Sequence, residues 1–232
     1  QALGEYMNKR ITFMVEETPF FETSFLVKEK LVDPDKFVGM LGVVGLHDCV
    51  NKLLEDSGGF RYGHDEEADD LGQRILNEID KFTSNFPAVY SKLTNNRYLL
   101  HAQAGLSHQK GITPGVRIKV GDEPDNLLEH IRHSKQFHHY FPTGVSDIFP
   151  VESTAQNNPT ALLDLIKGAF SMDIRYLSFY TADGDLIRIT GYLAKRSEME
   201  KFKNNIPVLQ DTSHGAVQNF ENNCVGDRKV RF

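Results

Sequence analysis

The stretch DLIRITGYLAKRSEMEKF, residues 185–202, places Gly191 inside an apolar, β-branched run where glycine is ordinarily unfavourable. One interpretation is structural: a bulge, a kink or a close backbone approach, and spacing alone favours it. The other is chemical. Loss of one α-hydrogen from glycine leaves a carbon radical that the neighbouring amide nitrogen and carbonyl both delocalise. That overlap needs a planar backbone without a crowding Cβ, which only glycine supplies.

Sulfur chemistry is limited to two cysteines, Cys49 and Cys224. Two cysteines do not make a disulfide framework, and no CxxC or HExxH spacing is present, so we expect no metal site. Cys49 lies in a stretch expected to be helical, where a buried or half-buried thiol is the ordinary case. Cys224 lies in an Asn- and Gly-rich tail, either as a plain tail thiol or as an exposed redox-sensitive group.

Two further groups of polar residues could do chemistry. His130 and His133 are spaced i, i+3 on an expected helix and could share a metal, but no accompanying ligand set has a recognised spacing. Packing or surface roles are therefore favoured for both. Thr113, Arg117 and Asp122 lie on a long polar loop, which is either a solvated connection or part of a cavity wall.

The elements that must position these residues alternate between helical and strand-like patterns, which predicts an α/β fold. An acidic first turn and the stripe of Leu71, Ile75, Ile79 and Phe82 predict a long helix ending before Pro87. Helices are also expected over 1–31, from Asp33 with Pro34 at the first helical position, and over 46–57, 125–133 and 158–170. Strands are expected over 97–105, 174–181 and 185–192, the last two joined as a hairpin by the turn sequence ADGD.

Bulk properties narrow the class of protein. A formal net charge of −6 gives no reason to expect nucleic-acid binding. No run of about 18 apolar residues is present, so no membrane span is expected, and the absence of a signal-peptide layout predicts a reduced, cytoplasmic protein. The chain starts without Met in what reads as the middle of a helix, which predicts that it is part of a longer protein.

Several motifs resemble those of glycyl radical enzymes. RITGY, residues 188–192, is similar to their Arg-Val-x-Gly-Tyr signature, with Ile189 in place of Val. VVGLHD at 43–48 resembles a segment of the anaerobic ribonucleoside-triphosphate reductases, with Asp48 where they carry Glu. YFPTGVSDIFP at 140–150 resembles another of their segments and aligns Thr143 with its Thr.

The resemblance is closer to the YjjI-type glycine radical enzymes of anaerobic bacteria over residues of about 18–203. It rests on the phrases FFETSFLVKEKL, LHAQAGLS, TPGVRIKVGDEPD, GVSDI and LIRITGYLAKRSEMEKF. This resemblance implies a ten-stranded α/β barrel, of which the chain is the C-terminal half. The implied divisions are 1–173 in the barrel, 174–210 as the glycine radical segment and 211–232 as a tail.

The resemblance also implies site roles. Gly191 stores the radical, and Arg188 and Tyr192 frame it. His47 and Asp48 resemble a barrel-strand end and, with Thr113, would line a substrate pocket. His138, His139 and Thr143 would face a small polar substrate from the segment after the expected helix. The family's radical passes to a cysteine thiyl; Cys49 is one possibility, but the family pattern favours a cysteine upstream of this chain.

The implied partners follow from that chemistry. A separate radical-SAM activating enzyme, with a 4Fe–4S cluster and S-adenosylmethionine, installs the radical, so the chain itself binds no cofactor. The radical is oxygen-sensitive and requires anaerobic conditions. We also expect two further partners, the upstream half of the same protein and a small-molecule substrate. The expected reaction is of a lyase, dehydratase or reductase type. Whether the protein forms a homodimer is left open by the sequence.

The sequence also differs from the motifs of these families, and the differences leave other functions open. The reductases carry a four-cysteine zinc site just before the radical loop, and this chain has no cysteine there. A reductase-like protein lacking zinc and a non-catalytic spare radical module are therefore the alternatives. An α/β hydrolase using a His/Asp pair has no G-x-S-x-G motif to support it.

Overall fold

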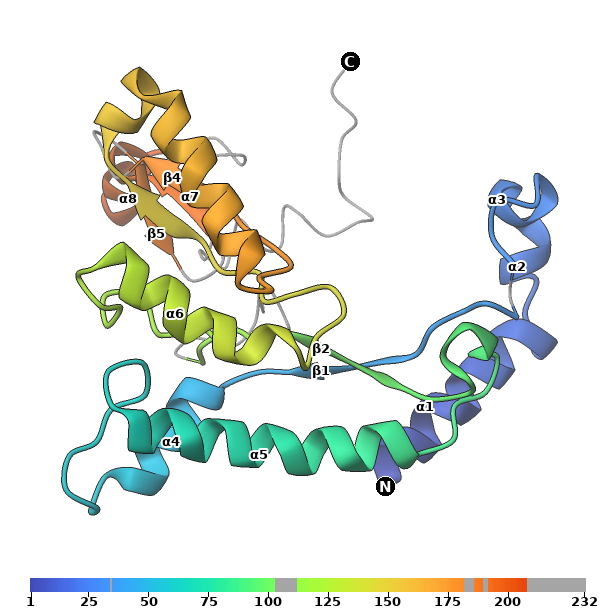
Figure 1. The fold of residues 1–232 in the computed structure, drawn as a ribbon. Coiled ribbons are helices and arrows are strands. Elements are labelled where there is room, and N and C mark those ends of the chain that lie inside the picture. The colour runs from blue at the N-terminus through green and yellow to red at the C-terminus, as the bar shows by residue number, and fades with distance from the viewer. Residues whose placement is uncertain (34, 103–111, 182–185, 190–191, 208–232) are drawn as a thin grey trace.

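The computed structural model describes residues 1–33, 35–102, 112–181, 186–189 and 192–207 (Figure 1). Helices and strands are mixed along the chain, which confirms the α/β class. The α-helices are α1 Ala2–Thr12, α2 Phe20–Thr23, α3 Phe25–Lys28, α4 Leu46–Leu54, α5 Glu66–Asn85, α6 Leu127–His138, α7 Pro159–Ser171 and α8 Arg196–Lys203. The strands are β1 Met40–Val43, β2 Leu99–Ala102, β3 Phe149–Val151, β4 Phe179–Thr181, β5 Leu186–Ile189 and β6 Tyr192–Lys195. Short turns of π-helix (η1, Phe13–Glu17) and 3₁₀-helix (η2, Lys92–Thr94; η3, Ser153–Asn157) complete the elements.

The described strands pair into three two-stranded sheets. β1 and β2 are parallel, with Met40 opposite Leu99, and β3 and β4 are parallel, with Phe149 opposite Phe179. Parallel neighbours require a long crossover, which α4 and α5 supply in the first pair and α7 in the second. β5 and β6 pair antiparallel. The described residues therefore show parallel α/β units followed by a hairpin.

Two apolar clusters form the core, and α6 contributes to both. The larger lies around the β1–β2 pair, between α5 and α6 in Figure 1, and contains Leu46, Val50, Tyr62, Ala68, Leu76, Leu100, Ala102, Val116, Ile118, Phe137, Tyr140, Phe141 and Val145. The smaller joins α6 and α7 to β3 and contains Ile131, Phe149, Ala169 and Ile174. Because α6 is anchored by both clusters, its polar side chains are held in fixed positions.

The predicted helix with an acidic first turn is confirmed as α5, but its buried line differs from the predicted stripe. Ala68, Gly72 and Leu76 are buried, whereas Ile79 and Phe82 are exposed. The small residues allow Tyr62 to pack against the helix, and a Cβ at Gly72 would lie only 2.8 Å from the Tyr62 ring.

The helix predicted to start at Asp33 is wrong. The Asp33 carboxylate accepts a hydrogen bond from the backbone N–H of Asp35 (3.0 Å), and the chain then runs extended into β1 at Met40. An Asp side chain supports a turn by the same hydrogen bond with which it caps a helix. Pairing with β2, almost 60 residues later in the sequence, selects the strand here (Met40 opposite Leu99).

The predicted hairpin partner is also wrong. β4 pairs with β3 and not with β5, and β5 instead pairs with β6, with Ile189 opposite Tyr192. The residues of the ADGD turn, 182–185, lie outside the described residues. The strand predicted over 97–105 is confirmed over Leu99–Ala102, and the one predicted over 174–181 only over its last three residues.

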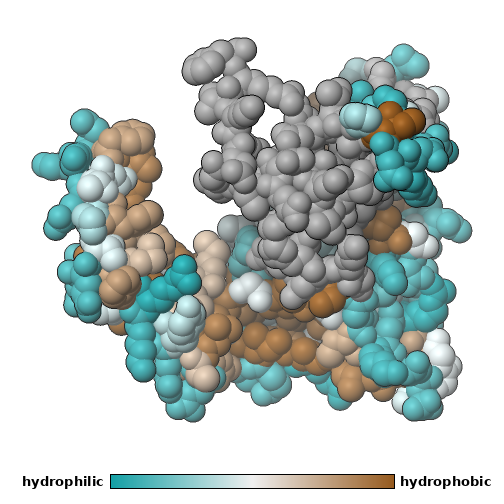
Figure 2. Space-filling view, turned by 180° about the vertical axis from the view of Figure 1, so that it is seen from behind, coloured by the Kyte–Doolittle hydropathy of each residue, from teal (hydrophilic) through white to brown (hydrophobic). Residues whose placement is uncertain are grey.

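The helices α1, α2 and α3 form an arm that projects from the body (Figure 1). Asn8 fastens α1 to the body: its side chain donates to the carbonyl of Pro87 (2.9 Å) and accepts from the Tyr98 hydroxyl (2.6 Å). Apolar side chains are exposed along the arm, as Figure 2 shows from the opposite side, among them Phe20 and Phe25. In the described residues, no helix combines the length and the apolar character needed to cross a bilayer.

Candidate functional site

The hairpin β5–β6 brackets the glycine singled out from the sequence. Arg188 lies opposite Leu193 and Ile189 opposite Tyr192, so two residues, Thr190 and Gly191, separate the paired strands in the sequence. Both lie outside the described residues. Of the two residues predicted to frame the glycine, Arg188 is the last but one residue of β5 and Tyr192 is the first residue of β6.

His47, Asp48 and Thr113 come together beyond the carboxyl end of β1. The Asp48 carboxylate accepts the backbone N–H of Thr113 (2.7 Å), and the Thr113 carbonyl accepts the backbone N–H of Gly45 (2.8 Å). Gly45 has a φ of +72°, which suits glycine and lets the chain turn from β1 into α4. The three residues thus lie close together, with Thr113 held by its backbone N–H and carbonyl.

A carboxylate faces each ring nitrogen of the buried His47. Its Nδ1 lies 3.4 Å from Asp48 Oδ1, and its Nε2 lies 3.1 Å from Asp122 Oδ2. Asp122 also binds the Arg61 guanidinium. Burial acts to raise the pKa of Asp122, but the His47 hydrogen bond and the Arg61 charge outweigh it, and the pKa lies below its usual value. His47 Nε2 also lies 3.1 Å from the Asn51 amide nitrogen, so three side chains fix the orientation of the ring.

Thr113 offers an unused polar atom at this cluster. Its side chain is 5 % exposed, and its Oγ1 is buried without a hydrogen-bond partner among the residues that the structure describes. A buried hydroxyl without a partner is costly and is uncommon in folded proteins. Arg117, on the same stretch, is buried and donates to the Ser146 carbonyl (3.1 Å).

A second pair of polar groups lies at the end of β2. The exposed Thr143 has its hydroxyl 3.3 Å from His101 Nδ1. His139 is exposed and packs against the Tyr140 ring at a tilt of 38°, with ring centroids 3.8 Å apart. These two predicted substrate-facing residues, Thr143 and His139, are therefore open to a partner or ligand.

His138, also predicted to face a substrate, lies inside the protein. It is 1 % exposed, and its Nδ1 accepts the backbone N–H groups of Val145 (3.3 Å) and Arg175 (3.1 Å). Its Nε2 lies 3.3 Å from the Ser134 hydroxyl. Both ring nitrogens thus contact protein groups.

Cys49 lies on α4, as predicted, but it is exposed, and the predicted burial is wrong. The core-facing side of α4 is taken by Leu46, His47 and Val50, so the thiol at position 49 faces away from it. Cys224 lies outside the described residues.

His130 and His133 do not share a site. His130 Nε2 binds the buried Asp147 (2.9 Å), and His133 Nδ1 binds the buried Asp69 (2.9 Å). Two histidines on one helix are thus each fixed by a carboxylate from a different segment. Within the described ranges no group of three or more His, Cys, Asp or Glu residues is arranged to hold a metal ion.

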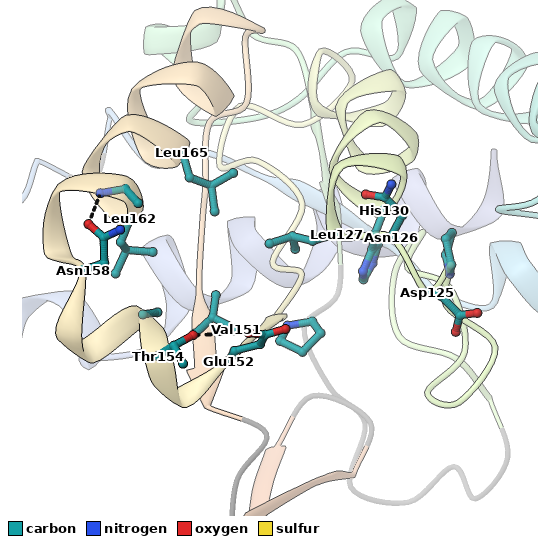
Figure 3. A pocket seen from close by; sticks show the side chains of 14 residues that line it. Asp125, Asn126, Leu127, His130, Val151, Glu152, Thr154, Asn158, Leu162 and Leu165 are labelled. Carbon is teal, nitrogen blue, oxygen red and sulfur yellow. Dashed lines mark hydrogen bonds between the residues drawn. The ribbon is translucent and has the colours of Figure 1, made fainter.

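Sequence reasoning missed a pocket of ≈ 740 Å³ at the carboxyl end of β3 (Figure 3). Leu127, Val151, Leu162 and Leu165 form apolar walls, and polar groups come from Asp125, Asn126, His130, Glu152, Thr154 and Asn158. Asn126 and Asn158 cap α6 and α7, accepting the N–H groups of Leu128 (2.9 Å) and Ala161 (3.2 Å). The sequence predicts helices over 125–133 and 158–170, but it does not show that their starts meet in space.

Burial of His138 gives a pH dependence. Burial lowers its pKa from 6.5 to about 4; Arg175 adds to this effect and Asp147 opposes it. Between these two values the unfolded chain binds the proton and the folded chain does not. The corresponding stability, about 3 kcal/mol, is therefore complete above pH 6.5 and is lost as the pH falls toward 4.

The check is urea unfolding of wild type and His138→Asn at intervals from pH 4 to 7. Asparagine keeps an acceptor but does not titrate, so its profile should fall less steeply with acidification. Parallel profiles for the two proteins would contradict the assignment.

Comparison with known proteins identifies the family of the chain. The model of the YjjI-like glycyl radical enzyme family matches residues 1–231. The chain is 41 % identical over 229 residues to an uncharacterized protein of Haemophilus influenzae and 39 % identical over 198 residues to the uncharacterized protein YjjI of Escherichia coli. These alignments include 97 % and 85 % of this chain but only 44 % and 38 % of the relatives. The chain thus spans less than half the length of the curated relatives it matches.

Solved structures show the same fold. An anaerobic ribonucleotide reductase superposes with a TM-score of 0.58 at 12 % identity, covering 87 % of this chain and 38 % of the reductase. The anaerobic ribonucleotide reductase from Thermotoga maritima, in complex with dATP and CTP, gives 0.54 at 12 % identity, covering 88 % and 41 %. At this identity the likeness concerns the fold alone. With the family match over nearly its whole length, the chain belongs to the YjjI-like family of glycyl radical enzymes.

Proposed function

We propose that this chain is the part of a glycyl radical enzyme that stores an organic radical on Gly191. The observation that carries the proposal is the pairing of Ile189 with Tyr192, which brackets residues 190 and 191 within a hairpin of a chain that matches the family. A separate radical-SAM activating enzyme, holding a 4Fe–4S cluster and S-adenosylmethionine, removes one α-hydrogen from Gly191. The remaining electron is shared with the flanking amide groups, which makes the radical long-lived in the absence of oxygen.

In the proposed reaction the radical passes to a cysteine thiol, and the thiyl radical removes a hydrogen atom from the substrate. We place that cysteine outside residues 1–232, in the upstream part of the full protein. Cys49 is a poor match because its thiol is exposed on the side of α4 away from the core. The upstream part would also supply the remaining strands of a ten-stranded barrel.

The substrate we propose is a small polar molecule bound at the carboxyl ends of β1 and β2. Ligands of parallel α/β folds bind at this edge of the sheet. Three observations support this placement: the His47 ring between two carboxylates, the unpartnered Thr113 hydroxyl and the exposed Thr143 beside His101. His47 would hold a proton near the reacting atoms, and Thr113 would bind a polar substituent.

A ribonucleotide reductase activity is not proposed, although the solved neighbours carry that name. The four-cysteine zinc site of the reductases has no counterpart before Gly191, because Cys49 and Cys224 are the chain's two cysteines. The substrate class therefore differs from theirs in this proposal.

The experiment that tests radical storage is cleavage by air. Full-length protein is activated anaerobically with its radical-SAM enzyme and S-adenosylmethionine, and is then exposed to oxygen. Oxygen adds to the carbon radical and breaks the backbone there, so mass spectrometry should show two fragments divided at Gly191. Protein exposed to air without activation should stay intact. An intact chain after activation and air exposure counts against the proposal.

A further inference from the structure

Residues 172–178 lead the chain from α7 into β4, which precedes the β5–β6 hairpin in the sequence. This segment lies between α7 and β4 and is neither helix nor strand. Ile174 lies in the smaller apolar cluster with Ile131 of α6, and the Ser178 carbonyl accepts the backbone N–H of Phe149 in β3 (2.8 Å). Further contacts from the end of α6 help to fix the segment that leads the chain toward β5 and β6.

His138 provides one such contact. It is the last residue of α6, and its Nδ1 accepts two backbone N–H groups at once, from Val145 (3.3 Å) and Arg175 (3.1 Å). An acceptor of two N–H groups carries no proton, so the ring is the neutral form protonated on Nε2, which points to the Ser134 hydroxyl (3.3 Å). One buried ring thus joins a helix end, a turn and the segment before β4.

Shape reinforces the hydrogen bonds. Residues 138–145, here called the 138–145 turn, are closed by the Gly144 N–H bound to the Phe141 carbonyl (2.9 Å). Gly144 has a φ of +77°, and a Cβ there would lie 2.9 Å from Tyr176 Cβ and 3.1 Å from the Tyr176 nitrogen. The Arg175 guanidinium donates to the Phe141 carbonyl (3.1 Å) from the other side. The turn and residues 175–176 therefore interlock through three separate contacts.

The same turn reaches the end of β2. Thr143, near its tip, contacts His101 Nδ1 (3.3 Å). The 138–145 turn is thus shared by the polar edge of the β1–β2 pair and the segment that leads to the hairpin.

We propose that His138 is a positioning residue that sets the hairpin of Gly191 relative to the polar edge formed by His101 and Thr143. The role rests on the proposed function of Gly191. His138 acts through the backbone of Arg175 and has no contact with substrate in this assignment. This role requires a hydrogen-bond acceptor at the position of Nδ1. It does not require the rest of the imidazole ring.

The test compares His138→Leu with His138→Asn in the full-length protein by amide hydrogen exchange. The asparagine oxygen takes about the place of Nδ1, whereas leucine fills the space without an acceptor. We expect exchange over residues 175–181 to be about tenfold faster or more in His138→Leu and near wild type in His138→Asn. Exchange in α5 should be the same in all three proteins. Unchanged protection of residues 175–181 in His138→Leu overturns the proposal.

A measurement on the wild-type protein keeps the proposal testable if the His138→Leu variant fails to fold. Nitrogen-15 resonance of the His138 ring should show an unprotonated Nδ1, with slow exchange of the Val145 and Arg175 amide hydrogens. A ring protonated on Nδ1 overturns the assignment.

The number of radical spins per chain tests the positioning role directly, because a purely structural role would leave it unchanged. After activation, spins per chain should fall several-fold in His138→Leu and recover in His138→Asn. Equal spin yields in wild type and a folded His138→Leu overturn the positioning role. An absent signal in wild type overturns the function proposed for Gly191 instead, and because hydrogen exchange needs no activation, the two failures are told apart.

Discussion

Replacing Gly191 with alanine is expected to abolish the radical signal of the activated protein. Alanine also has an α-hydrogen, but its methyl group crowds the planar backbone in which the flanking amides share the electron. The measurement is electron paramagnetic resonance after anaerobic activation. Wild type should give a signal split in two by the single remaining α-hydrogen, and the variant should give none.

Two controls make this result specific. At Gly168, within α7, an added Cβ would meet no atom within 4 Å among the described residues outside its own helix backbone, so Gly168→Ala should fold normally and keep the full signal. Protein labelled with α-deuterated glycine should lose the resolved splitting while keeping its spin count, because deuterium couples more weakly than hydrogen. A split signal of unchanged shape in Gly191→Ala would place the radical on another residue.

Features that depend on nearby residues were predictable. The start of the α5 helix follows from Glu66 and Glu67 in its first turn, whose charge suits the helix dipole without a distant partner. α6 and α7 begin beside Asn126 and Asn158, whose side chains satisfy backbone N–H groups two or three residues away. The alternation of strands and helices, which predicts the α/β class, likewise depends on patterns among residues that are close in the sequence.

Features decided by distant partners were not predictable. A carboxylate such as Asp33 supports a turn as well as a helix start, and the pairing of β1 with β2 decides between them. The β4 strand could form a hairpin or join a parallel neighbour, and only β3, about 30 residues earlier (Phe149 opposite Phe179), settles the choice. Burial of Gly72 in place of Ile79 reflects the Tyr62 ring, which comes from the loop before α5.

The candidate site also contains residues that the sequence could identify and contacts that it could not. His47, Asp48 and Thr113 were singled out by motif, and the structure brings them together although Asp48 and Thr113 are 65 positions apart. The three hydrogen-bond contacts of the His138 ring could not be inferred, because residue type alone does not tell a buried acceptor from a substrate contact. One signal was present: the glycine six residues later, which permits the turn that wraps the ring.

Replacing Asp69 with alanine is expected to produce the largest loss of stability among single side-chain changes near the site, about 3–5 kcal/mol. Asp69 is 7 % exposed and accepts three hydrogen bonds, from the Gly63 N–H (2.8 Å), His133 Nδ1 (2.9 Å) and Gln136 Nε2 (3.3 Å). It therefore fastens α5 both to the loop before it and to α6. Removal leaves a buried imidazole and a buried N–H without partners, which costs more than the hydrogen bonds themselves contribute.

The matched control is Asp70→Ala, one position along α5, where the side chain is exposed. It loses only a favourable charge near the helix start and should cost less than about 1 kcal/mol. Urea unfolding followed by circular dichroism gives both values, and equal losses would show that the Asp69 hydrogen bonds add little. Since α6 also carries His138, Asp69→Ala should speed hydrogen exchange over residues 175–181 as well, whereas Asp70→Ala should leave it unchanged. That difference would connect the hydrogen bonds of Asp69 to α6 with the segment that leads to Gly191.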